Sequence, residues 1–173
     1  MSLRDLVTIA LVVLPLGLCK AQTAPAKPVE PTAIGIIYLI APSTQELKKL
    51  PSEQSKQMFE RCGFGKACNY VMVSGNASSF RLKANEKAEF AFQTGSPEKV
   101  SLYLFEHKKN DRQFLTEKIA PPMKGGSEEI RGLSIEVSKY GESSYKLLPA
   151  SPLTPGEYAI IIAGEIYTFG VDQ

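Results

Sequence analysis

The sequence predicts an all-β fold, an antiparallel β-sandwich of short strands, for residues 33–173. Short apolar or alternating segments recur along this part and are separated by Gly, Asn, Pro or charged clusters, which is the spacing typical of a sandwich or barrel. A Pro-Gly turn near residue 155 then leads into two apolar segments joined at Gly164, which predicts a closing hairpin. The length matches one domain with one core.

The first 21 residues have the three parts of a cleavable secretory signal peptide: a charged start, an apolar run over residues 6–18, and small residues near the cut. The apolar run is shorter than the roughly 20 residues that a membrane-spanning helix needs. We therefore expect cleavage after Ala21, with Ala24 as the second choice, and no transmembrane span in the mature chain. The protein would then be secreted or periplasmic.

Cys19 offers an alternative, because a cysteine that ends a signal run can become the lipidated first residue of a lipoprotein. The residue before it is Leu18, where a lipoprotein signal has a small side chain. Cleavage without a lipid anchor is the preferred interpretation.

Residues 22–32 are rich in Pro and Ala and have little to bury, which predicts an extended linker. The 20 basic and 18 acidic residues give a formal net charge of +2, and removal of Arg4, Lys20 and Asp5 with the signal lowers it by one. This balance does not favour a nucleic acid as partner, so we expect a protein or another envelope ligand.

Cys62 and Cys68 are the two cysteines that remain after Cys19 is removed. An even pair in an exported protein predicts a disulfide, here closing a short loop with two glycines. A metal site is disfavoured because no His or acidic cluster lies nearby, and a redox pair is disfavoured because the spacing is wider than Cys-x-x-Cys. We expect no cofactor.

Residues 34–41 form a β-branched apolar run that ends at Pro42 and predicts a buried strand. Residues 43–60 are polar with spaced apolar positions, which predicts one or two short helical turns. The polar segment 107–112 contains Asn-Asp and predicts a hairpin turn. Further strands are expected at residues 69–73, 79–82, 88–93, 100–106, 113–119, 133–137 and 145–148.

Alternation assigns the faces of two of these strands. Ala88, Phe90 and Phe92 share one face and are expected in the core, as are Val100, Leu102 and Leu104 on the next strand. Tyr103 and Phe105 would then point outward. With Phe64, at the tip of the cysteine loop, they form a candidate contact patch.

The sequence Leu153-Thr-Pro155-Gly156-Glu-Tyr158 resembles the tyrosine corner of immunoglobulin-like and fibronectin-type sandwiches. The resemblance implies that the Tyr158 hydroxyl bonds to the backbone of the turn and that Leu153 packs beside the ring. It favours an immunoglobulin-like sandwich over a closed barrel.

A second resemblance covers the C-terminal half. Residues 137–147, the Pro-Gly-Glu-Tyr-Ala that follows, and the closing Phe-Gly-Val-Asp of residues 169–172 resemble exported bacterial proteins of unknown function. This resemblance implies that the protein is exported, and it implies no catalytic activity or ligand.

Residues for catalysis are few. His107 is the only histidine and lies beside two lysines, as expected for a solvated turn residue rather than a general base. No serine lies in Gly-x-Ser-x-Gly, and the Asn76 sequon matters only in a eukaryotic secretory pathway. The acids that could supply an acid and base pair are Glu142, Glu157, Glu165 and Asp172.

These observations predict an exported, non-catalytic binding or accessory module of the cell envelope or extracellular space. A small secreted hydrolase or carbohydrate-active enzyme is one alternative, and it requires two of the candidate acids or His107 in a common cleft. A structural envelope component that assembles through a free sheet edge is the other alternative.

Overall fold

The computed structural model describes residues 27–63, 65–84, 86–121 and 125–173. The predicted signal peptide, Cys19 and the first part of the predicted linker lie outside these residues. Within them the protein is all-β, as the sequence predicts, and its sheets are antiparallel except for one short parallel pair and one isolated bridge.

Two sheets form the body of the protein. The first has the order β12 (Ile135–Lys139), β13 (Tyr145–Pro149), β7 (Phe90–Phe92), β1 (Ile37–Ile40) and β2 (Leu47–Lys49). The second has the order β3 (Ser52–Glu53), β15 (Glu165–Val171), β14 (Gly156–Ile162) and β8 (Ser101–Leu104), with β6 (Arg81–Leu82) parallel to β15. The two sheets pack face to face in a sandwich-like arrangement.

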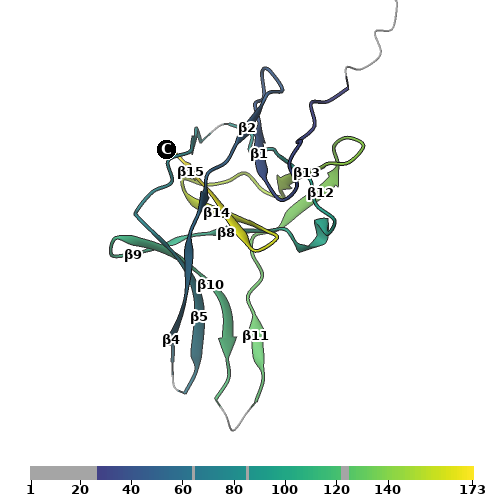
Figure 1. Ribbon diagram of the computed structural model, residues 1–173. Helices are drawn as coiled ribbons and strands as arrows, with labels where there is room; N and C mark the ends of the chain where they lie inside the picture. Colours follow the sequence, from purple (N-terminus) through teal and green to yellow (C-terminus); the bar gives the residue numbers. More distant parts are fainter. Residues whose placement is uncertain (1–26, 64, 85, 122–124) are drawn as a thin grey trace, which may run out of the picture.

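A third sheet extends as an arm, with its long strands running away from the two packed sheets (Figure 1). Its strand order is β11 (Ser127–Glu129), β10 (Asp111–Ile119), β5 (Ala67–Ser74) and β4 (Ser55–Arg61), and β9 (Glu106–Lys108) also pairs with β10. We call β4, β5, β10 and β11 the arm.

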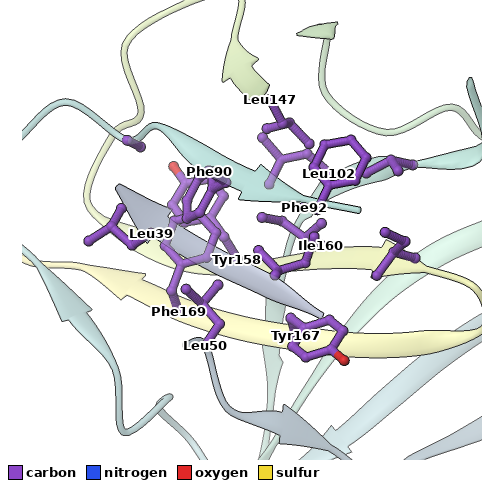
Figure 2. Packing of buried hydrophobic residues seen from close by; sticks show 14 of the residues in the cluster. Leu39, Leu50, Phe90, Phe92, Leu102, Leu147, Tyr158, Ile160, Tyr167 and Phe169 are labelled. Carbon is purple, nitrogen blue, oxygen red and sulfur yellow. The ribbon is translucent and has the colours of Figure 1, made fainter. Parts of the chain in front are cut away.

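The main core lies between the two body sheets (Figure 2). Phe90 and Phe92 enter it from the first sheet, as alternation predicts, and Phe169 enters it from the second. The ring centroids of Phe90 and Phe169 are 5.0 Å apart, and those of Tyr158 and Phe169 are 5.3 Å apart. Aromatic pairs at these separations add to the free energy gained by burial.

A smaller core covers the opposite face of the second sheet. Val73 and Phe114, near the root of the arm, pack against Ala159 and Ile166 on β14 and β15. Both faces of β14 are therefore buried, which explains why its sequence is an almost continuous apolar run rather than an alternating one. The closing hairpin β14–β15 forms as predicted, with Ile162 opposite Glu165.

A hydrogen bond from Tyr158 holds the start of β14 to the turn that precedes it. The hydroxyl of Tyr158 donates to the carbonyl oxygen of Thr154 at 2.6 Å, and the residue is only 1 % exposed. Leu153 is half-buried and packs against the main core. Pro155 and Gly156 carry the chain from the turn into the strand.

The helical turns predicted for residues 43–60 do not form, and that prediction is wrong. This segment contains β2, β3 and β4, and the helical element in the described part of the chain is one 3-10 turn at Pro97–Lys99. Pairing with distant strands decides the outcome, because β2 pairs with β1 and β4 pairs with β5 along its whole length. Of the apolar positions in the segment, Leu50 is buried in the main core, whereas Phe59 is 63 % exposed.

The strand predicted at residues 100–106 divides into β8 and β9, which belong to different sheets. Phe105 lies between them, and its backbone N–H donates to the carbonyl oxygen of Glu157 at 2.8 Å. Alternation continues across this point, because Val100 and Leu102 enter the main core while Tyr103 and Phe105 belong to the smaller core on the opposite face of the second sheet. Leu104, at the end of β8, is 43 % exposed, although the pattern predicts it in the core.

The segment before β1 is held to the body by Glu30. The Glu30 carboxylate accepts hydrogen bonds from the backbone N–H groups of Glu142 and Ser143, at 2.9 and 3.0 Å, and from the Ser144 hydroxyl at 2.7 Å. A side chain on Gly141 would occupy the position of this carboxylate. The backbone hydrogen bonds from Glu142 and Ser143, followed by that from Ser144, lower the pKa of Glu30 to about 2.

We expect Tyr158→Phe to lower the free energy of unfolding by about 1 kcal/mol, because the hydrogen bond to the Thr154 carbonyl oxygen is lost while the buried ring stays in place. Urea denaturation measures the change. Tyr38→Phe is the matched control, since its hydroxyl has no protein partner within the described residues. Equal losses in the two variants would contradict a special role for the corner.

We expect Glu30→Gln to speed amide hydrogen exchange at Glu142 and Ser143, because a neutral amide oxygen is a weaker acceptor than a carboxylate. The folded-state pKa lies below the usual value of 4.5, so this contribution is present above pH 4.5 and is lost as the pH falls toward about 2. NMR titration of the Glu30 carboxyl checks the sign. Glu98→Gln is the control, and protection that does not change in Glu30→Gln would contradict the anchor.

Candidate binding surface

The structure brings two of the candidate acids together, on either side of one arginine. Arg81 contacts the Glu157 carboxylate and binds Asp172 Oδ1 with its Nε and Nη2 at 2.9 and 2.6 Å. Glu142 lies elsewhere, in an exposed ion pair with Lys27 at 2.8 Å. Glu165, at the β14–β15 turn, and His107, opposite Arg112 in β9, are both exposed, and among the described residues neither is bonded to Glu157.

Both oxygens of Glu157 are occupied by protein donors. Oε1 contacts Arg81, and Oε2 accepts from the backbone N–H of Ser78 at 2.7 Å and from Arg112 Nη1 at 3.2 Å. Glu157 is 5 % exposed. A carboxylate that is buried and bound by two guanidinium groups is not free to take a proton from a substrate or to attack it. Its role is structural.

Arg112 is the centre of this polar cluster and is fully buried. Its Nε donates to the carbonyl oxygen of Gly75 at 2.9 Å, and its Nη2 binds Glu53 Oε2 at 2.8 Å. Its guanidinium carbon lies 5.1 Å from the centre of the Phe105 ring. Every side of the guanidinium therefore has a partner, as a buried charge requires.

The sequence places Arg112 in a polar turn, and that interpretation is wrong for this residue. The turn itself is narrower, because Lys108 pairs with Asp111 and only Lys109 and Asn110 lie between them. Arg112 is the second residue of β10 and points at the outer face of the second sheet. The sequence held one signal of the polar cluster, which was Gly170, a glycine inside a strand. Its missing side chain leaves the space that Arg81 fills beside Glu157.

The predicted aromatic patch does not form from Tyr103 and Phe105. Phe105 is 5 % exposed and packs edge-on against Phe114, because the root of the arm covers the face of the second sheet on which Tyr103 and Phe105 lie. Tyr103 is half-buried and stacks on Phe114 with ring centroids 4.4 Å apart. Burial, with the nearby Glu129 carboxylate, raises the pKa of the Tyr103 hydroxyl. Phe64 lies outside the described residues.

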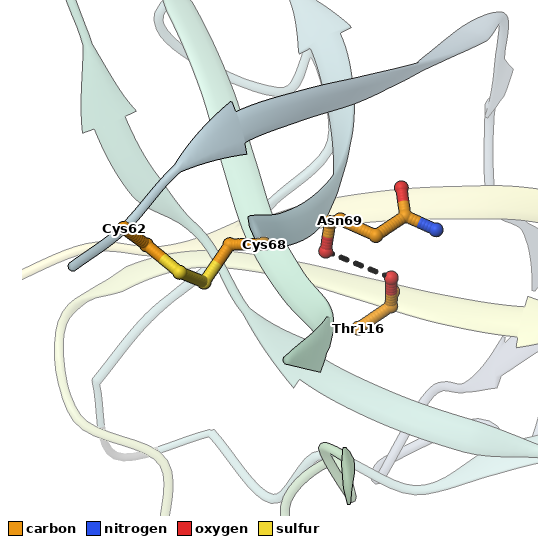
Figure 3. The surroundings of a disulfide bond; sticks show 4 residues. All are labelled: Cys62, Cys68, Asn69 and Thr116. Atoms are coloured by element: carbon orange, nitrogen blue, oxygen red, sulfur yellow. Dashed lines mark hydrogen bonds between the residues drawn. A yellow bond between two sulfur atoms is a disulfide. The ribbon is translucent and has the colours of Figure 1, made fainter. Parts of the chain in front are cut away.

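The predicted disulfide is confirmed and closes the tip of the β4–β5 hairpin (Figure 3). The Cα atoms of Cys62 and Cys68 are 5.7 Å apart. Beside it, the Thr116 hydroxyl donates to the carbonyl oxygen of Asn69 at 3.0 Å, at a bulge in β10 between Leu115 and Glu117. The disulfide and this bond fix the register of the arm at the end farthest from the body.

Strand β4 is the exposed outer strand of the arm. It pairs with β5 on one side, and within the described residues no strand pairs with it on the other side. All seven of its residues are exposed or half-buried, and Phe59 is 63 % exposed. The edge therefore offers a row of backbone donors and acceptors beside an exposed aromatic ring.

Other features give no catalytic or metal site. A groove of about 570 Å³ lies between the end of β13 and the segment 84–88, but the candidate acids Glu142, Glu157, Glu165 and Asp172 do not line it. Among the residues that the structure describes, no three His, Cys, Asp or Glu side chains are placed to hold a metal ion. In the same residues, no helix is long and apolar enough to cross a membrane.

Comparisons of the chain with protein families, with curated proteins and with solved structures find no match.

We expect Arg112→Met to lower the free energy of unfolding by about 3 kcal/mol or more, because it leaves Glu53 and Glu157 with too little compensating charge. Arg112→Lys keeps the positive charge but removes the planar guanidinium group with its several N–H donors, so we expect an intermediate loss of stability. Urea denaturation measures both. The exposed Arg131→Met is the control, and a loss in Arg112→Met no larger than in the control would contradict the role of the cluster.

Proposed function

We propose that this chain is an exported, non-catalytic binding or accessory module of the cell envelope or extracellular space, and that the arm is its binding element. The observation that carries the proposal is the arm itself: a sheet that projects from the body, is braced at its root by Arg112 and at its tip by a disulfide, and leaves β4 unpaired on one side. A rigid element that projects from the body and has an open strand edge is suited to binding a partner, whereas it adds little to the packing of the domain itself.

The strand order supports an immunoglobulin-like body. Taken along the chain, β1, β7, β8, β12, β13, β14 and β15 correspond to strands A to G. The first sheet then has the order D-E-B-A and the second G-F-C, as in the constant-type immunoglobulin sandwich. The hydrogen bond from Tyr158 to Thr154 agrees with the tyrosine corner of this class. The arm strands occupy the connections from A to B and from C to D.

The position of the arm supports binding as the role. Long connections that carry their own sheet are uncommon in a compact domain, and insertions of this kind usually have a function. The Cys62–Cys68 disulfide supports an oxidising compartment, which agrees with the predicted signal peptide. The occupied oxygens of Glu157 disfavour the hydrolase alternative.

The test is a photo-crosslinking amino acid placed at Phe59 in cells that export the chain, with the same group at Val137 as control. Val137 is also exposed but lies on β12, in the body. We expect crosslinked protein adducts from Phe59 and few from Val137, and we expect the exported chain to begin at Gln22 by intact mass. Equal yields at the two sites would contradict the arm as the binding element.

A further inference from the structure

The open edge of β4 has a sequence that is complementary to itself. The strand reads Ser-Lys-Gln-Met-Phe-Glu-Arg over Ser55–Arg61, with Met58 at its centre. It contains no proline, which would have blocked pairing, and its charged residues are of both signs. A long edge of this kind is a template for a further strand.

We propose that β4 pairs antiparallel with β4 of a second copy of this chain, with Met58 opposite Met58 of that copy. The inference rests on the proposed function, because it takes the arm as the binding element and names the partner. The two arms then form one continuous sheet.

Charge complementarity selects this register. With Met58 at the two-fold axis, Lys56 of each copy lies opposite Glu60 of the other, and both side chains lie on the same face of the sheet as Met58. Two oppositely charged cross-strand pairs form at once, and such pairs stabilise antiparallel strands. Among registers centred on Gln57, Met58 or Phe59, only the Met58 register sets oppositely charged β4 residues face to face.

The surroundings of these residues leave room for the pairing. Glu60 already contacts Lys108, and its side chain remains 36 % exposed, so it can accept a second cation. Lys56 is exposed. On the other face, Phe59 would lie opposite Gln57, which covers a ring that is otherwise 63 % exposed.

The geometry also limits the strength of the dimer. One seven-residue strand pair buries less surface than the roughly 1,200 Å² of a standard stable interface, so we expect a weak, concentration-dependent dimer. Antiparallel pairing sets the tip of each arm beside the root of the other, which places the two bodies at opposite ends of the shared sheet.

The test compares two charge-reversal variants, alone and mixed, with the wild-type chain. Sedimentation velocity of the purified chains from about 1 μM to about 1 mM at low salt measures self-association. K56E and E60K each set like charges opposite one another twice, so each alone should weaken self-association about tenfold or more. A 1:1 mixture should restore the dimer, because the acidic edge of K56E then faces the basic edge of E60K. Circular dichroism and thermal unfolding check that both variants fold.

The register has a separate readout that does not depend on charge. M58C should form an intermolecular disulfide under mild oxidation, since opposed Cβ atoms in paired strands are about 5 Å apart. S55C is the matched control. In the proposed register it lies six residues, about 20 Å, from the same position in the second copy, which is too far for a disulfide.

The proposal is overturned by a wild-type chain that stays monomeric throughout, by single reversals that associate as well as wild type, by a mixture that does not associate, or by S55C crosslinking as readily as M58C. Phe59 adducts to other proteins without a dimer would overturn this inference and leave the proposed function standing. A dimer of the pure chain without Phe59 adducts in cells would overturn the proposed function alone.

Discussion

The guanidinium of Arg112 joins segments that are far apart in the sequence. It lies on the arm and binds Glu53 on β3, Glu157 on β14 and the backbone at Gly75. Removing these charges from water is costly, so the partners must meet in one geometry for the cost to be offset. Apolar contacts such as Phe114 on Ala159 supply attraction but tolerate sliding. The ion cluster therefore sets the direction in which the arm leaves the body.

The second body sheet is the middle layer of this arrangement. One face packs on the first sheet through side chains such as Ile160, and the other is covered by the root of the arm, where Ala159 contacts Phe114. A strand buried on both faces cannot show alternation, so residues 158–162 of β14 form an unbroken apolar run. Beyond this covered region the arm sheet exposes its own surface, including the Phe59 ring on β4.

Local patterns account for what could be predicted from the sequence. The closing hairpin, the bond from Tyr158 to Thr154 and the Cys62–Cys68 disulfide each depend on residues close together in the chain. The burial of Phe105 could not be predicted, because alternation assigns the face on which it lies but does not show that the arm covers this face. Arg112 could not be placed either, since its partners are 37 to 59 residues away and nothing near it in sequence shows them.

The arm is assembled from two separate excursions of the chain, and this imposes an order on folding. The β4–β5 hairpin is closed by a short turn and needs only neighbouring residues, so it can form while later strands are still unfolded. Its attachment to the body waits for β14, which carries Glu157 and lies close to the C-terminal end. Contacts of such long sequence separation form slowly. In a newly made chain, the ion pair that attaches this hairpin sheet to the body therefore cannot form until the strand that carries Glu157 has been made.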